Sequence, residues 1–561
     1  MQRHQPMTGR RRAGLLVPLF CCPSSTSWGV GDIGDIPPAA AWLSAAGQRI
    51  LQLLPMNEMA PGQQSPYSAI SAMAIDPIFI RVPGVTDFEA LGGEPCMPPD
   101  DRAAIDRARR APRIEYEAVR RVKGRALRAA FERFVEAEWR RDTHRARALR
   151  MFVSQQAWWI EDYSLFRAIH VREDERPWTE WPRDLQRRDP ATIDRVRREL
   201  AGEVLFYQYL QWLAASQWRE ARERTGGVAL FGDLPFMVDG DSADVWARQH
   251  QFNLDVTIGA PPDAFSASGQ DWGMPLYRWD VIAAEDFRWL RERARRSADL
   301  YDGYRVDHLV GFYRTYANPK DGSRPFFTPA DEPSQVALGE RVLAIFREPG
   351  TEIIAEDLGI VPDFVRASLA RLGVPGFKVF RWERHWHTEG QPFREPSEYP
   401  AVSVATSGTH DTEPLAIWWE GASEDERSKI NRLATVQRVS GGADITYAPF
   451  DDRVRDLLLE AIVSSGSDIV LLPVQDVFGW RDRINEPAKV DDVNWTFRLP
   501  WPIDRMDEVP EASERQRKLR EWTDRYRPYQ QTKNTKNNHE ETKNDREGTK
   551  NHEALLIKES S

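Results

Sequence analysis

The sequence predicts an α/β protein, a (β/α)8 TIM-type barrel with a large, mainly helical insertion between its second and third strands. Short apolar runs recur along the chain, and most are continuous, which is typical of parallel strands covered on both faces. Helical segments lie between most runs, as at residues 38–46 and 363–372, and this alternation favours a barrel. The eight runs span residues 14–19, 49–56, 228–238, 301–309, 352–359, 376–382, 402–411 and 468–477.

The interval between the second and third runs is too long for a single helix. Residues 101–225 are rich in Arg, Glu, Ala and Leu, which favours helices. The spacing i, i+3, i+4, i+7, i+8 of an amphipathic helix is followed by Leu127, Ala130, Phe131, Phe134 and Val135. We therefore expect a helical subdomain that leans on the barrel, with the tryptophans of residues 158–181 as a buried contact layer.

The two ends of the chain are expected to differ from its middle. Residues 1–12 are predicted to be a flexible N-terminus, and residues 13–525 a single catalytic barrel that includes the insertion. Residues 530–561 contain the triplet TKN four times and scarcely an apolar side chain before Ala554. Such a segment cannot bury enough surface to offset its ordering entropy, so we expect a disordered tail.

The composition of the chain indicates which kinds of partner and which cellular compartment are to be expected. The formal net charge of −10 does not attract phosphate backbones, so no nucleic-acid partner is expected. Three cysteines are too few for a disulfide framework and lack metal-site spacing, which favours a reducing compartment. The apolar run 14–20 is short for a signal peptide, and no other segment approaches a membrane span. We predict a cytoplasmic protein without a membrane partner, as a monomer or weak homodimer.

Charged side chains stand at the ends of four of the eight runs, where a TIM barrel carries its active site. These side chains are Asp233, Arg305, Asp307, His308, Glu356, Asp357, His410 and Asp411. A structural ion pair would explain any one carboxylate. Carboxylates at four run ends would repel one another if they lay close together, so such a cluster is unfavourable unless a ligand or a mechanism requires it.

Paired carboxylates of this kind suggest glycoside chemistry with retention, which needs an ionised nucleophile and a protonated acid about 5–5.5 Å apart. Arg305 could keep Asp307 ionised, whereas the apolar strand before Glu356 favours a protonated carboxyl group there. Asp411, with His410 beside it, could hydrogen-bond sugar hydroxyls. The 21 tryptophans fit sugar stacking and a large core equally well.

Three run ends, YRVDHLVG, IIAEDLG and TSGTHD, resemble in order and spacing the catalytic motifs of the amylomaltase or 4-α-glucanotransferase family, glycoside hydrolase family 77. Further blocks resemble the family in the same order, among them SSTSWGVGDIGD, FGDLPFMVDGDSADVW, PPDAFSASGQDWGMPLYRWD and LLPVQDVFGWRDRINEP. The resemblance covers roughly residues 13–525, and the combination of blocks is highly specific.

The resemblance implies a role for each matching position. Asp307 matches the nucleophile, Glu356 the general acid/base and Asp411 the carboxylate that stabilises the transition state. Substrate contacts are implied for Tyr67, Asp233, Asp263, Trp272, Arg305, His410 and Asn485. Two of these, Asp263 and Trp272, match a mobile loop that closes over the bound glucan.

The expected reaction moves α-1,4-glucan segments between maltooligosaccharides and needs no metal or organic cofactor. An α-glucan hydrolase on the same barrel, a non-catalytic glucan-binding protein and a metal-dependent barrel hydrolase are the alternatives. The chain departs from the family where TSGTHD continues with Thr412 and Glu413 instead of asparagine and an acid. This departure puts fine substrate contacts and chain-length preference in doubt, but leaves the three carboxylates in place.

Overall fold

A computed structural model describes residues 11–262, 269–487, 489 and 491–528. The expected flexible N-terminus lies outside the described residues except for its last two, and Arg12 already begins the first strand. The expected disordered tail, residues 530–561, lies outside them as well. Within the described residues, no helix is both long enough and apolar enough to cross a membrane.

Eight parallel strands close into a barrel in the order in which they occur along the chain, and each predicted apolar run contributes one of them. The predicted fold is therefore confirmed. The barrel strands are β1 (Arg12–Leu16), β2 (Ile50–Gln52), β3 (Ala229–Leu234), β6 (Gly303–Val306), β9 (Glu352–Ala355), β10 (Gly376–Val379), β11 (Ser403–Thr406) and β12 (Ile469–Pro473).

The interior of the barrel is filled by its own apolar cluster, separate from the core between strands and helices. This cluster contains Ile50, Phe231, Ile354, Phe377, Val379, Val404, Ile469 and Leu471. Gly303 makes room for it, because a Cβ atom there would lie 2.6 Å from the Phe231 ring. The barrel is thus a packed core, and polar chemistry is confined to the ends of its strands.

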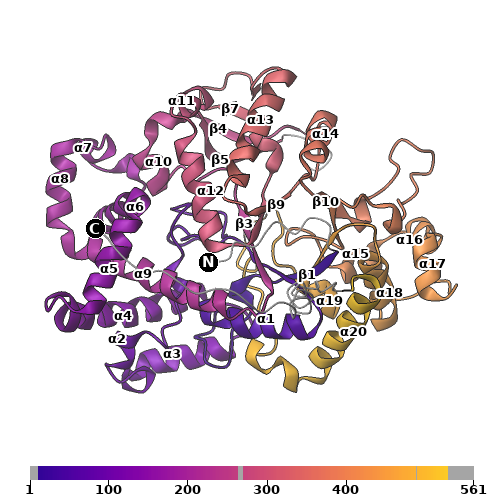
Figure 1. The fold of residues 1–561 in the computed structure, drawn as a ribbon, viewed down its shortest axis with the longest axis horizontal. Helices are drawn as coiled ribbons and strands as arrows, with labels where there is room; N and C mark the ends of the chain where they lie inside the picture. The colour runs from indigo at the N-terminus through magenta and orange to yellow at the C-terminus, as the bar shows by residue number, and fades with distance from the viewer. Residues whose placement is uncertain (1–10, 263–268, 488, 490, 529–561) are drawn as a thin grey trace, which may run out of the picture.

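The long interval between β2 and β3 is mainly helical, as predicted, and its helices gather on one side of the barrel (Figure 1). The helices are α2 (Thr86–Glu89), α3 (Pro99–Arg110), α4 (Tyr116–Phe134), α5 (His144–Gln155), α6 (Ala157–Arg172), α7 (Arg183–Gln186), α8 (Pro190–Glu199) and α9 (Ala201–Glu223). Trp159, Trp178 and Trp181 are buried in the core, in agreement with the predicted contact layer.

A four-stranded antiparallel sheet, which the sequence did not predict, stands beside the barrel with the strand order β5-β4-β7-β8. Its strands are β4 (Phe252–Ala260), β5 (Gln270–Tyr277), β7 (Thr315–Pro319) and β8 (Phe326–Thr328). β4 and β5 precede barrel strand β6, whereas β7 and β8 follow it, so this sheet joins two successive connections of the barrel. Gly273 and Pro275 within β5 are unusual in strands, which concealed it from a reading of the sequence.

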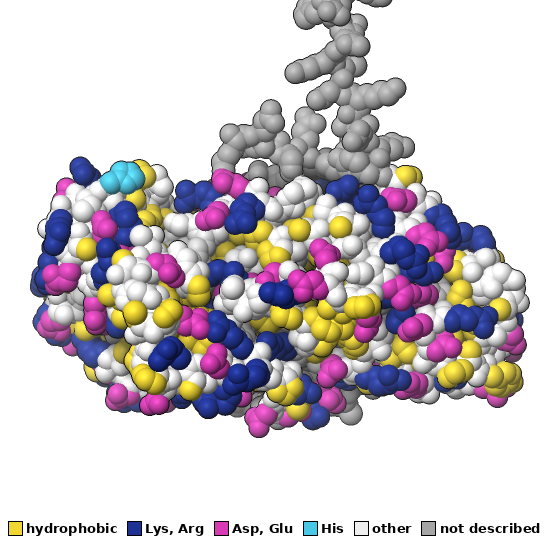
Figure 2. Space-filling view, turned by 90° about the horizontal axis from the view of Figure 1, so that it is seen from below, with side chains coloured by type: hydrophobic (Ala, Val, Ile, Leu, Met, Phe, Trp, Pro, Cys, Tyr) yellow, Lys and Arg dark blue, Asp and Glu magenta, His cyan; other side chains and the backbone are white. Residues whose placement is uncertain are grey.

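The remaining helices lie around the barrel, the antiparallel sheet and the insertion, and α1 and α14 occupy the two segments predicted to be helical (Figure 1). They are α1 (Ile36–Ala45), α10 (Ala243–Ala247), α11 (Trp279–Ala284), α12 (Arg288–Leu300), α13 (Glu332–Arg347), α14 (Asp363–Leu372), α15 (Leu415–Gly421), α16 (Glu424–Asn431), α17 (Ala434–Ser440), α18 (Asp452–Val463), α19 (Val474–Phe478) and α20 (Pro510–Tyr526). On the face in Figure 2, basic and acidic side chains are intermingled, which suits a chain of small net charge per residue.

Candidate active site

Four of the predicted side chains come from three neighbouring barrel strands. Asp233 and Arg305 lie opposite each other in the β3–β6 pairing. Asp307 follows the last residue of β6, and Glu356 follows the last residue of β9, which pairs with β6. Because parallel strands end at a common edge, this pairing brings the four side chains together at one mouth of the barrel.

Arg305 connects two of the carboxylates. Its Nη1 donates to both oxygens of Asp233, at 2.9 and 2.8 Å, and its Nη2 lies 2.8 Å from Oδ1 of Asp307. The side chains of Arg305 and Asp233 are 4% and 0% exposed, whereas that of Asp307 is 28% exposed. Burial raises the pKa of Asp233 to about 7, against the opposing effect of Arg305. Asp307 is thus the ion-paired carboxylate that remains open to a ligand.

Glu356 is held by backbone donors on both of its carboxyl oxygens. The His308 N–H donates to Oε2 at 2.7 Å, and the Leu358 N–H donates to Oε1 at 3.2 Å. Burial raises the pKa of Glu356 to about 8; Arg305 opposes this shift and the Asp307 charge adds to it. A carboxyl group with this pKa retains its proton at neutral pH, so it can act as an acid beside the carboxylate of Asp307.

The other side of the mouth is built by the segment after β11 together with two distant loops. His410 Nε2 lies 3.0 Å from the Tyr67 hydroxyl and 3.2 Å from Oδ2 of Asp411. The Tyr67 hydroxyl donates to Asp233 at 3.0 Å, which links this side to the Arg305 pair. Asn485 Nδ2 donates to Oδ1 of Asp411 at 2.6 Å. Burial lowers the pKa of His410, so its ring is neutral at neutral pH.

Trp272 reaches the site from β5, on the antiparallel sheet. Its ring meets the His308 imidazole edge-on, with centroids 4.8 Å apart, and lies 6.3 Å from the Phe236 ring. Trp272 therefore stands next to the residue that follows Asp307. Asp263, its predicted companion, lies outside the described residues.

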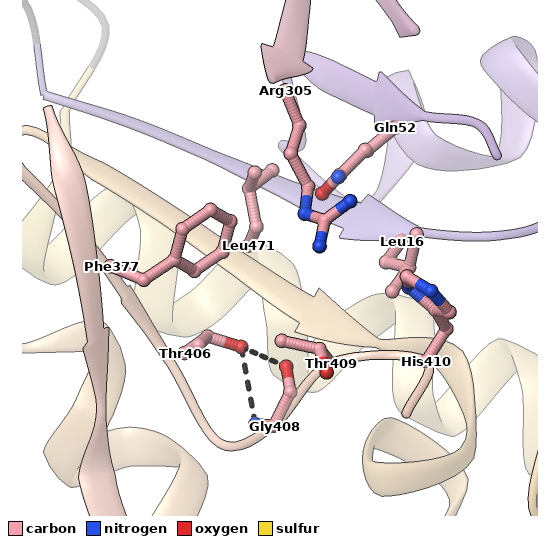
Figure 3. A pocket seen from close by; sticks show the side chains of 9 residues that line it. All are labelled: Leu16, Gln52, Arg305, Phe377, Thr406, Gly408, Thr409, His410 and Leu471. Atoms are coloured by element: carbon pink, nitrogen blue, oxygen red, sulfur yellow. Dashed lines mark hydrogen bonds between the residues drawn. The ribbon is translucent and has the colours of Figure 1, made fainter. Parts of the chain in front are cut away.

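A small hollow at the mouth of the barrel is lined by two of these groups, Arg305 and His410. Figure 3 shows the Arg305 guanidinium pointing into it from the end of β6, with Gln52 and His410 nearby. Its floor is apolar, with Leu16, Phe377 and Leu471 among its lining residues. The hollow thus has an apolar base and a few polar groups at its edge.

Several side chains contribute in ways that the sequence did not reveal. Trp495 packs against the Tyr67 and His410 rings, each at 5.8 Å, and Arg483 donates to the Asp411 carbonyl oxygen at 2.9 Å. Both come from the quoted block LLPVQDVFGWRDRINEP and its continuation, but nothing in their types marked them out. Asp357 faces away from the cluster and accepts the Phe377 N–H at 2.7 Å, so it belongs to the barrel wall.

The departure at Thr412 and Glu413 has a local structural account. The Thr412 hydroxyl closes a turn by donating to the Thr409 carbonyl oxygen at 3.0 Å and accepting the Thr409 N–H at 3.0 Å. Glu413 lies 3.6 Å from Nη1 of the buried Arg381, which follows β10. No group of three or more His, Cys, Asp or Glu side chains among the described residues is arranged to hold a metal ion.

The raised pKa of Glu356 predicts how its replacement changes stability with pH. Between the ordinary value of 4.5 and about 8, the folded protein keeps a proton that the unfolded chain releases, so the free energy of unfolding falls as pH rises. Glutamine cannot ionise, so Glu356→Gln is expected to gain in melting temperature relative to the parent between pH 5 and pH 8. Calorimetry at each pH measures this difference.

Calorimetry in two buffers of different ionisation enthalpy is the control, since it separates proton release by the protein from buffer effects. A difference in melting temperature that stays constant over this pH range would contradict a protonated Glu356 in the folded state.

Comparisons with known proteins agree on one family. The family model described as 4-alpha-glucanotransferase matches residues 17–504. The 4-alpha-glucanotransferase of Thermus thermophilus is 32% identical over 531 residues, covering 92% of this chain and 99% of that protein. The enzyme of the same name from Synechocystis sp. is 31% identical over 522 residues, covering 88% and 94% of the two chains.

Among solved structures, the amylomaltase of Streptococcus agalactiae in complex with acarbose has a TM-score of 0.78 at 25% identity, covering 92% of this chain and 99% of that one. Its fold agrees with the barrel and its helical insertion. The chain therefore belongs to the 4-α-glucanotransferase family, glycoside hydrolase family 77, and is a glucanotransferase enzyme.

Proposed function

We propose that the protein transfers α-1,4-glucan segments between maltooligosaccharides by double displacement with retention. In the first step a carboxylate oxygen of Asp307 attacks the anomeric carbon, the glycosidic bond breaks, and Glu356 gives its proton to the departing oxygen. In the second step the 4-hydroxyl of an acceptor glucan attacks the same carbon. Glu356 takes the hydroxyl proton, and the bond to Asp307 breaks.

The environments of the two carboxyl groups support this division of roles. Asp307 is paired with Arg305 and more open, which suits a nucleophile. Glu356 has a pKa raised to about 8 by burial, which suits a group that must first donate a proton. The Asp307 charge contributes to that rise, so formation of the glycosyl bond, which removes the charge, lowers the pKa of Glu356 when it must become a base.

Asp411 is proposed to stabilise the transition state by binding sugar hydroxyls. Its Oδ1 is already oriented by Asn485 and its Oδ2 faces His410, so the carboxylate has little freedom to turn. Tyr67 is stacked on His410 with centroids 5.5 Å apart, and its hydroxyl donates to Asp233. Together with Asp233 and Arg305, these groups form the proposed donor-sugar site.

Acarbose in the Streptococcus agalactiae amylomaltase is an oligosaccharide ligand of a related fold. It supports a glucan-like chain as the proposed ligand of this protein. Asp263, outside the described residues, and Trp272 are proposed to contact the glucan beyond the cleaved bond. The compartment is proposed to be the cytoplasm, where maltooligosaccharides and glycogen are metabolised.

The observation that carries the proposal is the pair formed by an Arg305-bound Asp307 and a backbone-held Glu356 of raised pKa. Incubation with maltotriose tests it. A ladder of longer maltooligosaccharides together with glucose is expected. Cleavage to glucose and maltose without longer products would establish a hydrolase instead.

Trp272→Ala is expected to shift the products from transfer towards hydrolysis. Transfer exceeds hydrolysis only if water is kept from the glycosyl bond while a sugar hydroxyl is positioned there. Removing the indole beside His308 opens that space. The ratio of free glucose to longer oligosaccharides should rise several-fold, measured by chromatography at equal conversion.

Trp139→Ala is the matched control, since it removes a partly buried indole from the helical insertion, between α4 and α5. An unchanged product ratio in Trp272→Ala would contradict a role for this side chain in excluding water.

A further inference from the structure

His308 has a backbone conformation that few non-glycine residues adopt. Its φ of 42° and ψ of 52° are left-handed, a region that glycine and asparagine adopt readily and β-branched residues avoid. The residue lies between Asp307 and the turn Leu309–Phe312, which leads away from the end of β6. Such conformations persist where the surrounding structure holds them, and they cluster at active sites.

Two successive N–H groups point at Glu356: that of His308, which the peptide after Asp307 fixes, and that of Leu309, which the left-handed turn directs there. The His308 N–H donates to Oε2 at 2.7 Å, and the Leu309 N–H donates to the Glu356 carbonyl oxygen at 3.2 Å. Since Leu358 supplies the donor to Oε1, the His308 N–H is the contact that joins the carboxyl group to the strand carrying Asp307. An extended residue at this position would turn the Leu309 N–H away from Glu356, and the peptide that carries the His308 N–H would have to shift for the chain to continue.

We propose that His308 is a positioning residue, whose left-handed backbone holds the Glu356 carboxyl group in register with Asp307. This inference rests on the proposed acid/base role of Glu356 and adds a residue that acts through it. The strands β6 and β9 bring the two carboxyl groups to the same edge, and the His308 N–H fixes how one faces the other.

Packing of the imidazole holds this conformation in place. The ring lies between Trp272, at 4.8 Å, and Phe236, at 5.1 Å between centroids. Phe236 is seated over Gly311, where a Cβ atom would lie 2.3 Å from the phenyl ring. Burial lowers the pKa of His308 to about 4, so the ring is neutral at neutral pH and acts by packing.

The groups around Glu356 determine how its pKa would change if the His308 N–H were lost. Arg305 lowers the pKa of Glu356, Asp307 and Asp357 raise it, and the His308 N–H lowers it by stabilising the carboxylate. A chain that loses this donor is therefore expected to ionise Glu356 at higher pH. The basic limb of the pH profile of kcat/KM, where the acid becomes deprotonated, would move upwards.

The test is a series at this position, comprising His308→Gly, His308→Asn, His308→Ala and His308→Val. All four remove the imidazole, but only glycine and asparagine adopt the left-handed region readily. Transfer from maltotriose should fall in the order of backbone preference. The Gly and Asn variants are expected within about tenfold of the parent, Ala lower, and Val about 10²-fold lower, comparable to loss of a catalytic hydrogen-bond donor.

α-Maltosyl fluoride as donor separates positioning of the acid from general damage, because departure of fluoride needs little help from a proton. The first turnover of fluoride release by His308→Val should slow only a few-fold with this donor, whereas with maltotriose its basic limb should lie at higher pH. Circular dichroism and melting curves check each variant for folding. If His308→Val does not fold, His308→Ala is compared with the Gly and Asn variants instead.

Equal losses in all four variants would overturn the inference, since they would assign the effect to the imidazole. Equal losses with both donors would overturn it too, by making the role purely structural. Glu356→Gln distinguishes a failure of the proposed function. If that variant transfers maltotriose normally, the acid/base assignment is wrong. If it is inactive while the four His308 variants all transfer maltotriose at the same rate, only the positioning role fails.

Discussion

Asp307→Asn is expected to lower kcat/KM for maltotriose by about 10⁴-fold or more, the scale seen when a covalent nucleophile is removed. The amide has nearly the same size but cannot form the glycosyl bond, so folding should be little affected. Initial rates of oligosaccharide formation measure the loss. Asp524→Asn is the matched control, because that carboxylate lies on helix α20 and is 67% exposed.

The proposed covalent intermediate offers a second measurement. In Glu356→Gln protein, α-maltosyl fluoride can still react with Asp307, but no base remains to activate the acceptor, so the adduct should accumulate. Mass spectrometry of peptides should place it at Asp307. An adduct on Asp233 or Asp411, or residual transfer by Asp307→Asn above about 1% of the parent rate, would contradict the assignment.

Arg305→Met is expected to destabilise the fold by about 3 kcal/mol and to abolish transfer, because it leaves a buried carboxylate without its partner. Asp233 is 0% exposed and accepts two hydrogen bonds from Arg305, and the same guanidinium holds Asp307. Chemical denaturation measures the loss of stability, and the maltotriose assay measures the loss of transfer.

A double variant separates these two effects of Arg305. Arg305→Met with Asp233→Asn removes the unpaired buried acid, so it should regain stability while remaining inactive, since Asp307 is still without its arginine. Arg305→Lys is the conservative control, because it keeps the positive charge but loses the guanidinium that binds Asp233 and Asp307 at the same time. A double variant no more stable than Arg305→Met alone would contradict this account.

The barrel could be predicted because its strands are continuous apolar runs. Asp233, Arg305, Asp307 and Glu356 could be predicted because each stands within or directly after such a run. Because parallel barrel strands end at the same mouth of the barrel, these side chains are expected to lie close together there. The motif resemblance extended this to Tyr67 and Asn485, and the structure places both beside His410 and Asp411.

The details that could not be predicted depend on long-range packing or on single dihedral angles. The stacking of Tyr67 on His410 joins residues 343 positions apart through two irregular segments. The left-handed backbone of His308 has no signal in the sequence, since histidine does not require it. The antiparallel sheet was hidden because β5 contains Gly273 and Pro275, and because its four strands lie on both sides of β6.

That sheet has a consequence for how the enzyme could be re-engineered. The strand that carries Trp272 is paired through β4 to β7, which begins eight residues after Asp307. If the connection between β3 and β6 were replaced by that of a relative, the new β4 would have to pair with the original β7, whose sequence is not matched to it. The two connections have to be exchanged as one module, and chimaeras that replace only one of them should misplace Trp272 while leaving the barrel intact.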